Sequence, residues 1–240
     1  MTMITLRKAE EIYRAEGDIQ NGTFQGRWHF SFGEYYDPHY KGFGTLRVFN
    51  DDTLSPGAVW PLHPHRDIEV VTYCAAGQFR HADEHGEGGV LKKGWVQHTT
   101  VGRGMFHSEL NNLPDQPMRF VQMWFVPQKH GLTPSVEQKP VEQAERTNRL
   151  LALISNEDEE SLRIASDAKV YSCFLEQGKA VTYSFKEGYG GYLYVVEGGG
   201  ISANGKNLQH LDAAMIRDEA QLSIEANADA ELLLVVVPVK

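Results

Sequence analysis

Apolar and polar positions along the chain form short runs that turn-forming residues separate. The runs are rich in Val, Tyr, Phe and Thr and are bounded by Gly, Asp, Asn or Pro: TLRVFN, IEVVTYCAAG, WVQHTTV, RFVQMWFVP, KVYSCFLEQG, GGYLYVVEGGG, QLSIEA and ELLLVVVPV. β-Branched and aromatic residues between such breakers are typical of β-strands. Because strand follows strand, the pattern predicts an antiparallel sandwich or barrel and not alternating βαβ units.

Helical patterning is sparse. The best candidate is VEQAERTNRLLALI, residues 141–154, with lesser helical pieces near the N-terminus. It follows a segment that carries Pro127, Pro134 and Pro140 and is typical of a crossing between two domains. We therefore expect a boundary near residue 140.

The two resulting halves, 1–140 and 141–240, share a pattern of an apolar strand, a glycine and a polar turn. IEVVTYCAAGQFRHADEHG in the first half corresponds to GYLYVVEGGGISANGK in the second. This similarity indicates an internal duplication of one β-barrel.

Composition and charge narrow the function classes. The chain has 240 residues, of which 41% are hydrophobic and 23% charged, as in folded globular proteins. A formal net charge of -9 argues against a mainly electrostatic nucleic-acid binder. The N-terminus has no apolar signal-peptide core, and the longest apolar run, LLLVVVPV, is too short to span a bilayer. We expect a cytoplasmic protein with reduced, buried thiols at Cys74 and Cys173.

Two histidine-containing motifs carry the candidate chemistry. In PLHPHRDIEVVTY, His63 and His65 stand at alternate positions, and in VGRGMFHSELNN the same holds for His107 and Glu109. Alternate side chains of an extended strand share one face, so two such strands can assemble a four-ligand site. Imidazole with carboxylate suits Fe, Mn, Ni, Co or Zn.

The spacing alone does not select the carboxylate ligand. By strand alternation, Asp67 and Glu69 could face the barrel interior together with His63 and His65. Either Glu69 or Glu109 therefore suits the site at this point.

Several motifs together resemble those of a known superfamily. Gly57, five further residues and HPHRDIE, followed later by Gly94, GRG, His107 and Asn111, resemble the two motifs of the cupins. More narrowly, FSFGEYYDPHYKGFGTLRVFNDD, HPHRDIE, HADEHG and VGRGMFHSE resemble the pirin family. This close resemblance covers about residues 27–127. It implies an all-β bicupin, with two tandem jelly-roll-like cupin barrels and few short helices.

The resemblance also implies a ligand set. One divalent metal, most often iron, would be held in the N-terminal barrel by His63, His65, His107 and Glu109, with Mn, Ni, Co and Zn as alternatives. Cupins in general more often use the glutamate after the HxH motif, here Glu69. The pirin-like HSE favours Glu109 as the ligand and leaves Glu69 as a pocket carboxylate or a residue that orients a ligand.

The C-terminal half lacks this chemistry. Aligning Gly198 with Gly77 places Ser184 and Lys186 where His63 and His65 stand. We therefore expect one metal per chain.

Other residues near the motifs have structural interpretations. His81, Asp83 and His85 alternate in HADEHG, but the stretch is typical of a hairpin turn, as GRG at 102–104 is of a tight turn. His98 is expected to be a partly exposed strand histidine.

The aromatic stretch RWHFSFGEYYDP could line a pocket for a flat substrate, although core packing is the simpler expectation for each ring. Its members are Trp28, Phe30, Phe32, Tyr35 and Tyr36. Trp60, three residues before the first motif histidine, is expected near the mouth of the site.

The resemblance implies a metal-dependent dioxygenase, because pirin-like proteins include members with quercetin 2,3-dioxygenase activity. These open the central ring of a flavonol with O2 and release carbon monoxide. Glu109, or else Glu69, would remove the proton of the 3-hydroxyl. The expected partners are a small aromatic substrate such as a flavonol, and O2.

Two other function classes stay open. One is a metal-containing redox sensor that regulates by binding other proteins, which the same resemblance covers. The other, a cupin isomerase or sugar-binding module, would need more basic and polar residues near the ligands than the sequence offers.

Overall fold

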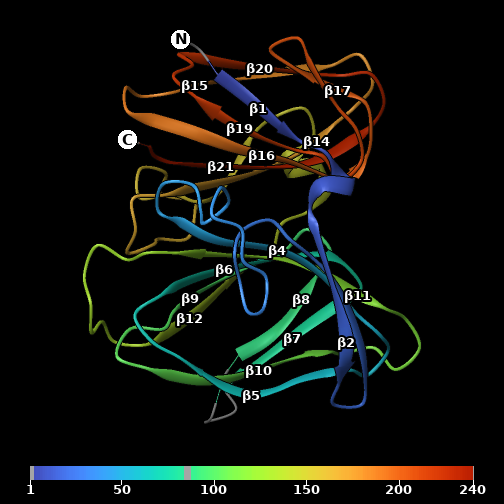
Figure 1. Cartoon of the computed structure of the whole chain (residues 1–240), viewed down its shortest axis with the longest axis vertical. Helices are drawn as coiled ribbons and strands as arrows, with labels where there is room; N and C mark the ends of the chain where they lie inside the picture. Colours follow the sequence, from blue (N-terminus) through green and yellow to red (C-terminus); the bar gives the residue numbers. More distant parts are fainter. Residues whose placement is uncertain (1–2, 84–87, 240) are drawn as a thin grey trace.

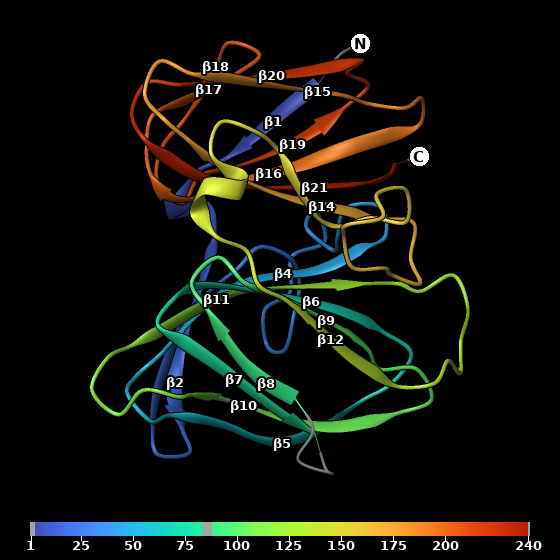
Figure 2. The ribbon, with the colours of Figure 1, turned by 180° about the vertical axis from the view of Figure 1, so that it is seen from behind.

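The computed structural model describes residues 3–83 and 88–239, and it consists almost entirely of β-strands. Two barrels stack on each other, with the N-terminal one in green and teal and the C-terminal one in orange and red (Figures 1 and 2). Each barrel is built from a large and a small sheet. The expected all-β bicupin is confirmed.

The N-terminal barrel places the two histidine motifs on its small sheet. That sheet has the spatial order β5 (Val59–His65), β10 (Met105–Asn111), β7 (Gln78–Asp83) and β8 (Gly88–Lys92). The large sheet has the order β12 (Ser135–Lys139), β9 (Val96–Thr100), β6 (Glu69–Ala76), β11 (Met118–Phe125), β4 (Leu46–Leu54), β3 (Gly22–Trp28) and β2 (Tyr13–Ile19). All pairings are antiparallel.

The C-terminal barrel repeats this plan but takes one strand from the start of the chain. Its large sheet has the order β1 (Met3–Arg7), β19 (Ala213–Arg217), β16 (Tyr189–Gly198), β21 (Ala230–Pro238), β14 (Lys169–Leu175) and β13 (Leu151–Ile154). Its small sheet has the order β15 (Ala180–Ser184), β20 (Gln221–Ala226), β17 (Ile201–Ala203) and β18 (Lys206–Leu208). The first strand of the chain thus belongs to the C-terminal barrel, because β1 pairs with β19. The two barrels therefore do not correspond to one uninterrupted stretch of sequence each.

The helix expected over 141–154 does not form. The segment instead holds a short 3-10 helix, η2 (Gln143–Arg146), and then the strand β13, with Asn148 in the left-handed region at φ 55° between them. Among the described residues near the N-terminus, one short 3-10 helix forms, η1 (Ala9–Glu11). Across residues 3–83 and 88–239, no helix has the length and apolar character needed to cross a membrane.

The two large sheets face each other across a shared hydrophobic core. Phe49 and Tyr73 from the first barrel pack with Tyr192, Tyr194 and Leu233 from the second, all fully buried. Polar contacts cross the same layer, since the hydroxyl of Tyr73 donates to Glu231 and that of Tyr194 donates to Asp51. This packing leaves the small sheet with β5 and β10 on the side of the N-terminal barrel away from the C-terminal barrel (Figures 1 and 2).

Candidate metal centre and aromatic cavity

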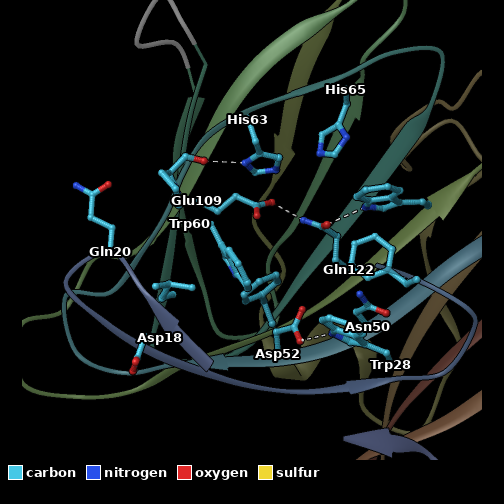
Figure 3. Close-up of a pocket in the computed structure, with 15 residues that line it drawn as sticks. Asp18, Gln20, Trp28, Asn50, Asp52, Trp60, His63, His65, Glu109 and Gln122 are labelled. Carbon is cyan, nitrogen blue, oxygen red and sulfur yellow. Dashed lines mark hydrogen bonds between the residues drawn. The ribbon is translucent and has the colours of Figure 1, made fainter. Parts of the chain in front are cut away.

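A cavity of about 530 Å³ opens between the two sheets of the N-terminal barrel (Figure 3). Aromatic rings form most of its wall: Trp28, Phe32, Trp60, Phe120 and Trp124. Polar side chains reach it from both sheets, and the histidines of the first motif are among them. Such a pocket, apolar with a few converging polar groups, is typical of a small-molecule site.

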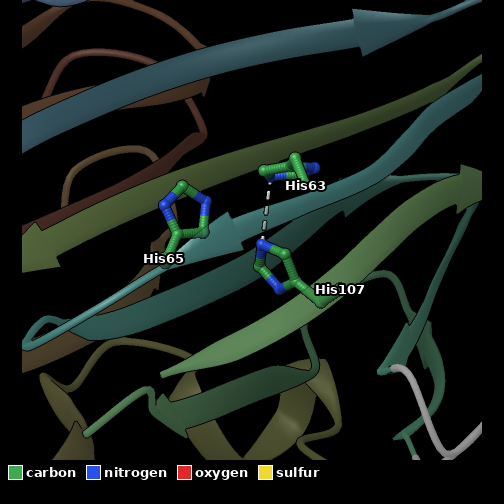
Figure 4. Close-up of side chains that lie close together, drawn as sticks. All are labelled: His63, His65 and His107. Atoms are coloured by element: carbon green, nitrogen blue, oxygen red, sulfur yellow. Dashed lines mark hydrogen bonds between the residues drawn. The ribbon is translucent and has the colours of Figure 1, made fainter. Parts of the chain in front are cut away.

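Three of the predicted ligands converge beside this cavity, and two of them, His63 and His65, line it. β5 and β10 are antiparallel neighbours, and His63 pairs directly with His107 while His65 pairs with Met105. One ring nitrogen from each histidine lies within 4.8 Å of the others, and His63 Nε2 is 3.1 Å from His107 Nε2 (Figure 4). The alternation of two neighbouring strands thus assembles the group, as the sequence predicts.

Neighbouring groups fix the orientation of two of these rings. His63 Nδ1 donates to the carbonyl oxygen of Pro61 at 2.8 Å, which leaves Nε2 with its lone pair. His107 Nδ1 lies 2.9 Å from His81 Nε2, so the His81 ring stands behind His107. Partners of this kind on the far ring nitrogen are typical of metal-binding histidines.

The histidine group fits a divalent cation. Burial, together with the neighbouring imidazoles, lowers the pKa of His65 to about 4 and that of His107 to about 3, so both rings are neutral at neutral pH. His65 Nε2 is buried and has no hydrogen-bond partner among the described residues. Neutral imidazoles whose lone pairs point at one another are stabilised by a cation between them, which supports a divalent metal here.

Glu109, the predicted fourth ligand, lies in the same cavity but outside the three-histidine group. It is 5% exposed and accepts a hydrogen bond from Gln122 Nε2, and Gln122 Oε1 in turn accepts from Trp124 Nε1 at 2.7 Å. His107 pairs with His63 and Glu109 pairs with Trp60, so the register shift adds its extra residue to β5. On β10, Glu109 therefore keeps the face of His107, and its side chain points toward Gln122 (Figure 3).

Glu69, the other candidate carboxylate, does not reach the cavity. The strand β5 ends at His65, and Asp67 takes a left-handed φ of 50° before β6 begins, so the alternation is not continuous from one strand to the next. Glu69 shares the face of Val71 and Tyr73, which is packed toward the second barrel. Its carboxylate accepts from Thr100 Oγ1 and from the backbone nitrogen of Ala165.

His98 differs from its expected partial exposure. It is only 3% exposed, and its Nε2 donates to Glu69 Oε2 at 2.8 Å. The adjacent strands β6 and β9 bring the two residues together. This pair thus belongs to the contact between the barrels and not to the cavity.

The aromatic stretch divides between both expectations. Trp28 and Phe32 line the cavity, whereas Phe30 is fully buried in the core between the barrels. Tyr35 stacks on Tyr13, and Tyr36 is 71% exposed. Trp60 lines the cavity, as its position before the first motif predicts.

Several cavity residues were not identified from the sequence, and two polar ones lie opposite the histidines. Asn50 and Asp52 lie at alternate positions of β4 and reach the cavity from the large sheet, opposite the histidines. The sequence NDD is typical of a turn, but here it lies inside the nine-residue strand β4. The usable signal is the i, i+2 spacing of the two polar residues, which places them on one face.

The remaining described motif residues do not line the cavity. His81 and Asp83 lie in the strand β7 and not in the hairpin turn expected for HADEHG, because β7 continues between β10 and β8. Residues 84–87, including His85, lie outside the described residues. GRG forms the expected tight turn, because Gly102 and Gly104 have φ of 53° and 137°. In the second barrel, Lys186 is exposed and forms an ion pair with Glu157.

Comparison with known families matches both barrels. The pirin family matches residues 10–125, and the family described as quercetinase C-terminal cupin domain matches residues 152–237. The two matches fall on the two barrels seen in the structure.

Individual relatives match over nearly the whole chain. A pirin-like protein of Caulobacter vibrioides is 38% identical over 91% of this chain and 94% of its own length. The quercetin 2,3-dioxygenase of Escherichia coli is 33% identical over 98% of this chain and 99% of its own. The crystal structure of the E. coli pirin YhhW in complex with nickel(II) has a TM-score of 0.90 and 31% identity, covering 99% of this chain and 100% of that chain. These relatives support a dioxygenase-type oxidoreductase.

Proposed function

Because the chain belongs to the pirin family, we propose that it is a metal-dependent dioxygenase that cleaves flavonols such as quercetin with O2. One observation carries the proposal: three histidines converge beside an aromatic cavity, and two of them, His63 and His65, line its wall. A cavity of about 530 Å³ suits a flat, drug-sized molecule, since such ligands occupy pockets of roughly 300–1,000 Å³. The relatives named quercetin 2,3-dioxygenase give further support.

The proposed metal ligands are His63, His65, His107 and Glu109. A divalent metal held there supplies a Lewis acid that acidifies the chelating hydroxyl of the substrate. Iron is the metal we propose, with Mn, Ni, Co and Zn as alternatives that elemental analysis of protein purified without chelators distinguishes. The nickel(II) complex of the E. coli pirin shows that a relative binds a divalent metal.

The protein's own residues would handle the proton and the position of the ring. Glu109, held by Gln122, accepts the proton of the flavonol 3-hydroxyl, because its carboxylate is buried in the cavity beside the histidine group. Trp60 and Trp124 flank the ring system and exclude water from it. O2 adds to C2 and C4, and the two bonds from C3 to these atoms break. C3 leaves as carbon monoxide with its own oxygen, both atoms of O2 remain in the other product, and Glu109 returns its proton to that product or to solvent.

The test is O2 uptake by the metal-loaded protein with a matched pair of compounds. Quercetin should be consumed together with O2, whereas the corresponding flavone without the 3-hydroxyl should be inert because it has no acidic proton to give Glu109. A His63→Ala protein is the control, since free metal ions also oxidise quercetin.

Equal rates for the loaded protein and the His63→Ala control, across several metals, would refute the dioxygenase proposal. The alternative of a metal-containing regulatory protein would then account better for the histidine group. We also propose a cytoplasmic location, in line with two buried free cysteines whose pKa burial raises to about 11.

A further inference from the structure

The wall of the cavity opposite the histidines carries two buried polar side chains whose hydrogen-bonding groups are not all used. Asn50 is 4% exposed, its Oδ1 is buried without a hydrogen-bond partner, and its amide makes no side-chain hydrogen bond among the described residues. Asp52 is 7% exposed, and only its Oδ1 is engaged, accepting from Trp28 Nε1 at 3.2 Å. Both line the cavity (Figure 3).

Unpaired buried polar groups are costly, so their presence in a cavity indicates a ligand or an ordered water. The contrast with Gln122 is informative, because that neighbouring amide is satisfied on both ends by Glu109 and Trp124. Gln122 and Asn50 are direct cross-strand neighbours, and only the Gln122 amide has hydrogen-bond partners on both its oxygen and its nitrogen.

The backbone opposite Asp52 makes room for its carboxyl group. Gly26 pairs with Asp52 across β3 and β4, and a Cβ added at Gly26 would lie 2.1 Å from Asp52 Oδ1 and 2.9 Å from Trp28 Nε1. Any larger residue would displace the carboxyl group or the indole. Gly26 therefore leaves room for the Asp52 carboxyl group, which the hydrogen bond from Trp28 orients through Oδ1.

We propose that Asn50 and Asp52 form a recognition subsite for a phenolic hydroxyl at the end of the flat substrate remote from the histidine group. This inference rests on the proposed function for the position of the chelating end. Asn50 offers its amide N–H groups as donors, and Asp52 offers a free oxygen as acceptor, which together match a hydroxyl that both donates and accepts.

The charge of the cavity selects a hydroxyl over an anion. Asp52 and Glu109 both lie in the cavity, and the described lining residues include no Lys or Arg. Burial, reinforced by the charges of Asp51 and Glu109 and opposed by the Trp28 bond, raises the pKa of Asp52 well above its usual range. A carboxylate on the ligand would be repelled, whereas a neutral phenol can bond to either form of Asp52.

The experiment measures flavonol binding to the metal-loaded protein without O2, by quenching of the tryptophans that line the cavity. The probes are 3-hydroxyflavone, which has only the chelating hydroxyl, and two partners that add a hydroxyl at C7 or at C4′. The wild-type protein should bind one of the hydroxylated partners about 10-fold more tightly than 3-hydroxyflavone, as one well-made hydrogen bond supplies.

Asn50→Ala and Asp52→Ala should each remove most of this preference, measured as the ratio of the two affinities within the same variant, because each takes away a hydrogen-bonding group of the subsite. Thr72→Val is the matched control: Thr72 is buried, pairs with Gln122, and is not among the cavity residues. It should keep the full preference. Thermal unfolding of each variant checks that the barrel is intact.

Equal affinity of the wild-type protein for all three compounds would overturn the inference and indicate that ordered water alone occupies this wall. A preference that survives both alanine substitutions would overturn it as well. Because binding is measured without turnover, selective binding with no O2 consumption would instead refute the proposed function and leave the subsite standing.

Discussion

At the scale of single residues, the two candidate carboxylates have different surroundings and should give different phenotypes. Glu69→Gln should leave the metal content per chain unchanged, because Glu69 contacts His98 and Ala165 between the barrels. It should lower the free energy of unfolding by about 1–3 kcal/mol, since a buried charge-assisted hydrogen bond is weakened. Metal analysis and urea unfolding measure the two effects.

Glu109→Gln is the matched comparison. We expect it to weaken metal binding while it perturbs unfolding less. Loss of metal in Glu69→Gln with retention in Glu109→Gln would reverse the assignment of the two carboxylates.

His81 should act as a positioning residue for His107, because their ring nitrogens are 2.9 Å apart and His81 is 2% exposed. His81→Leu should reduce metal affinity about 10- to 100-fold, the usual effect of losing a partner of a ligating histidine. Titration against a competing chelator measures the affinity. His81→Gln retains a hydrogen-bonding group and should recover part of it; equal affinity of the Leu variant and the wild-type protein would exclude this role.

Strand alternation predicts the histidine group correctly, but it does not predict the direction of Glu69, which follows the next turn. His63 and His65 lie within one strand, so i, i+2 spacing places both on one face. Glu69 follows a turn after which the side chains no longer keep the alternation of β5. The sequence HPHRDIE does not show that Asp67 adopts a left-handed conformation and ends this alternation. The sequence does not identify Asn50 as a cavity residue, because a polar residue inside a strand resembles the end of that strand.

At the scale of elements, the N-terminal strand β1 should stabilise the second barrel and not the first. It covers the edge strand β19, and Ile4 and Leu6 pack against the core of the C-terminal barrel. Removing residues 1–6 should therefore speed hydrogen exchange in β19, with β6 as the internal reference that keeps its protection. Unchanged exchange in β19 would contradict the pairing.

The segment 141–154 shows why one element was predicted wrongly. Its sequence has good helix formers, but Leu153 and Ile154 are fully buried in the core between the barrels, and β13 pairs with β14 at the edge of a sheet. Tertiary packing overrides a local preference worth only a few tenths of a kcal/mol per residue. Long-range pairing, such as that of β1 with β19, has no local sequence signal at all.

At the scale of the whole molecule, the contact between the barrels should be sensitive to acid through His29. This residue is fully buried, and its Nδ1 lies 2.7 Å from the hydroxyl of Tyr192 in the other barrel. Burial, and then the charges of Arg7 and Arg27, lower its pKa well below 6.5. Below about pH 6.5, His29 therefore binds a proton in the unfolded chain but stays neutral in the folded protein.

Stability should consequently fall as the pH drops below about 6.5, by up to about 1.4 kcal/mol per pH unit from this one group. His29→Gln should be less stable at neutral pH but should have a shallower pH dependence. Urea unfolding at about pH 7.5 and about pH 5.5 compares the slopes. Identical slopes for the variant and the wild-type protein would show that His29 is not the group responsible.

If the proposed function holds, the histidine group and the aromatic cavity together cleave a flavonol with O2. The most direct measurement is the carbon monoxide released per quercetin consumed by the metal-loaded protein, compared with the His107→Ala variant. We expect about one molecule of carbon monoxide per flavonol, because only C3 leaves the ring, and none above background from the variant. Flavonol loss without carbon monoxide, or equal release from both proteins, would contradict the claim.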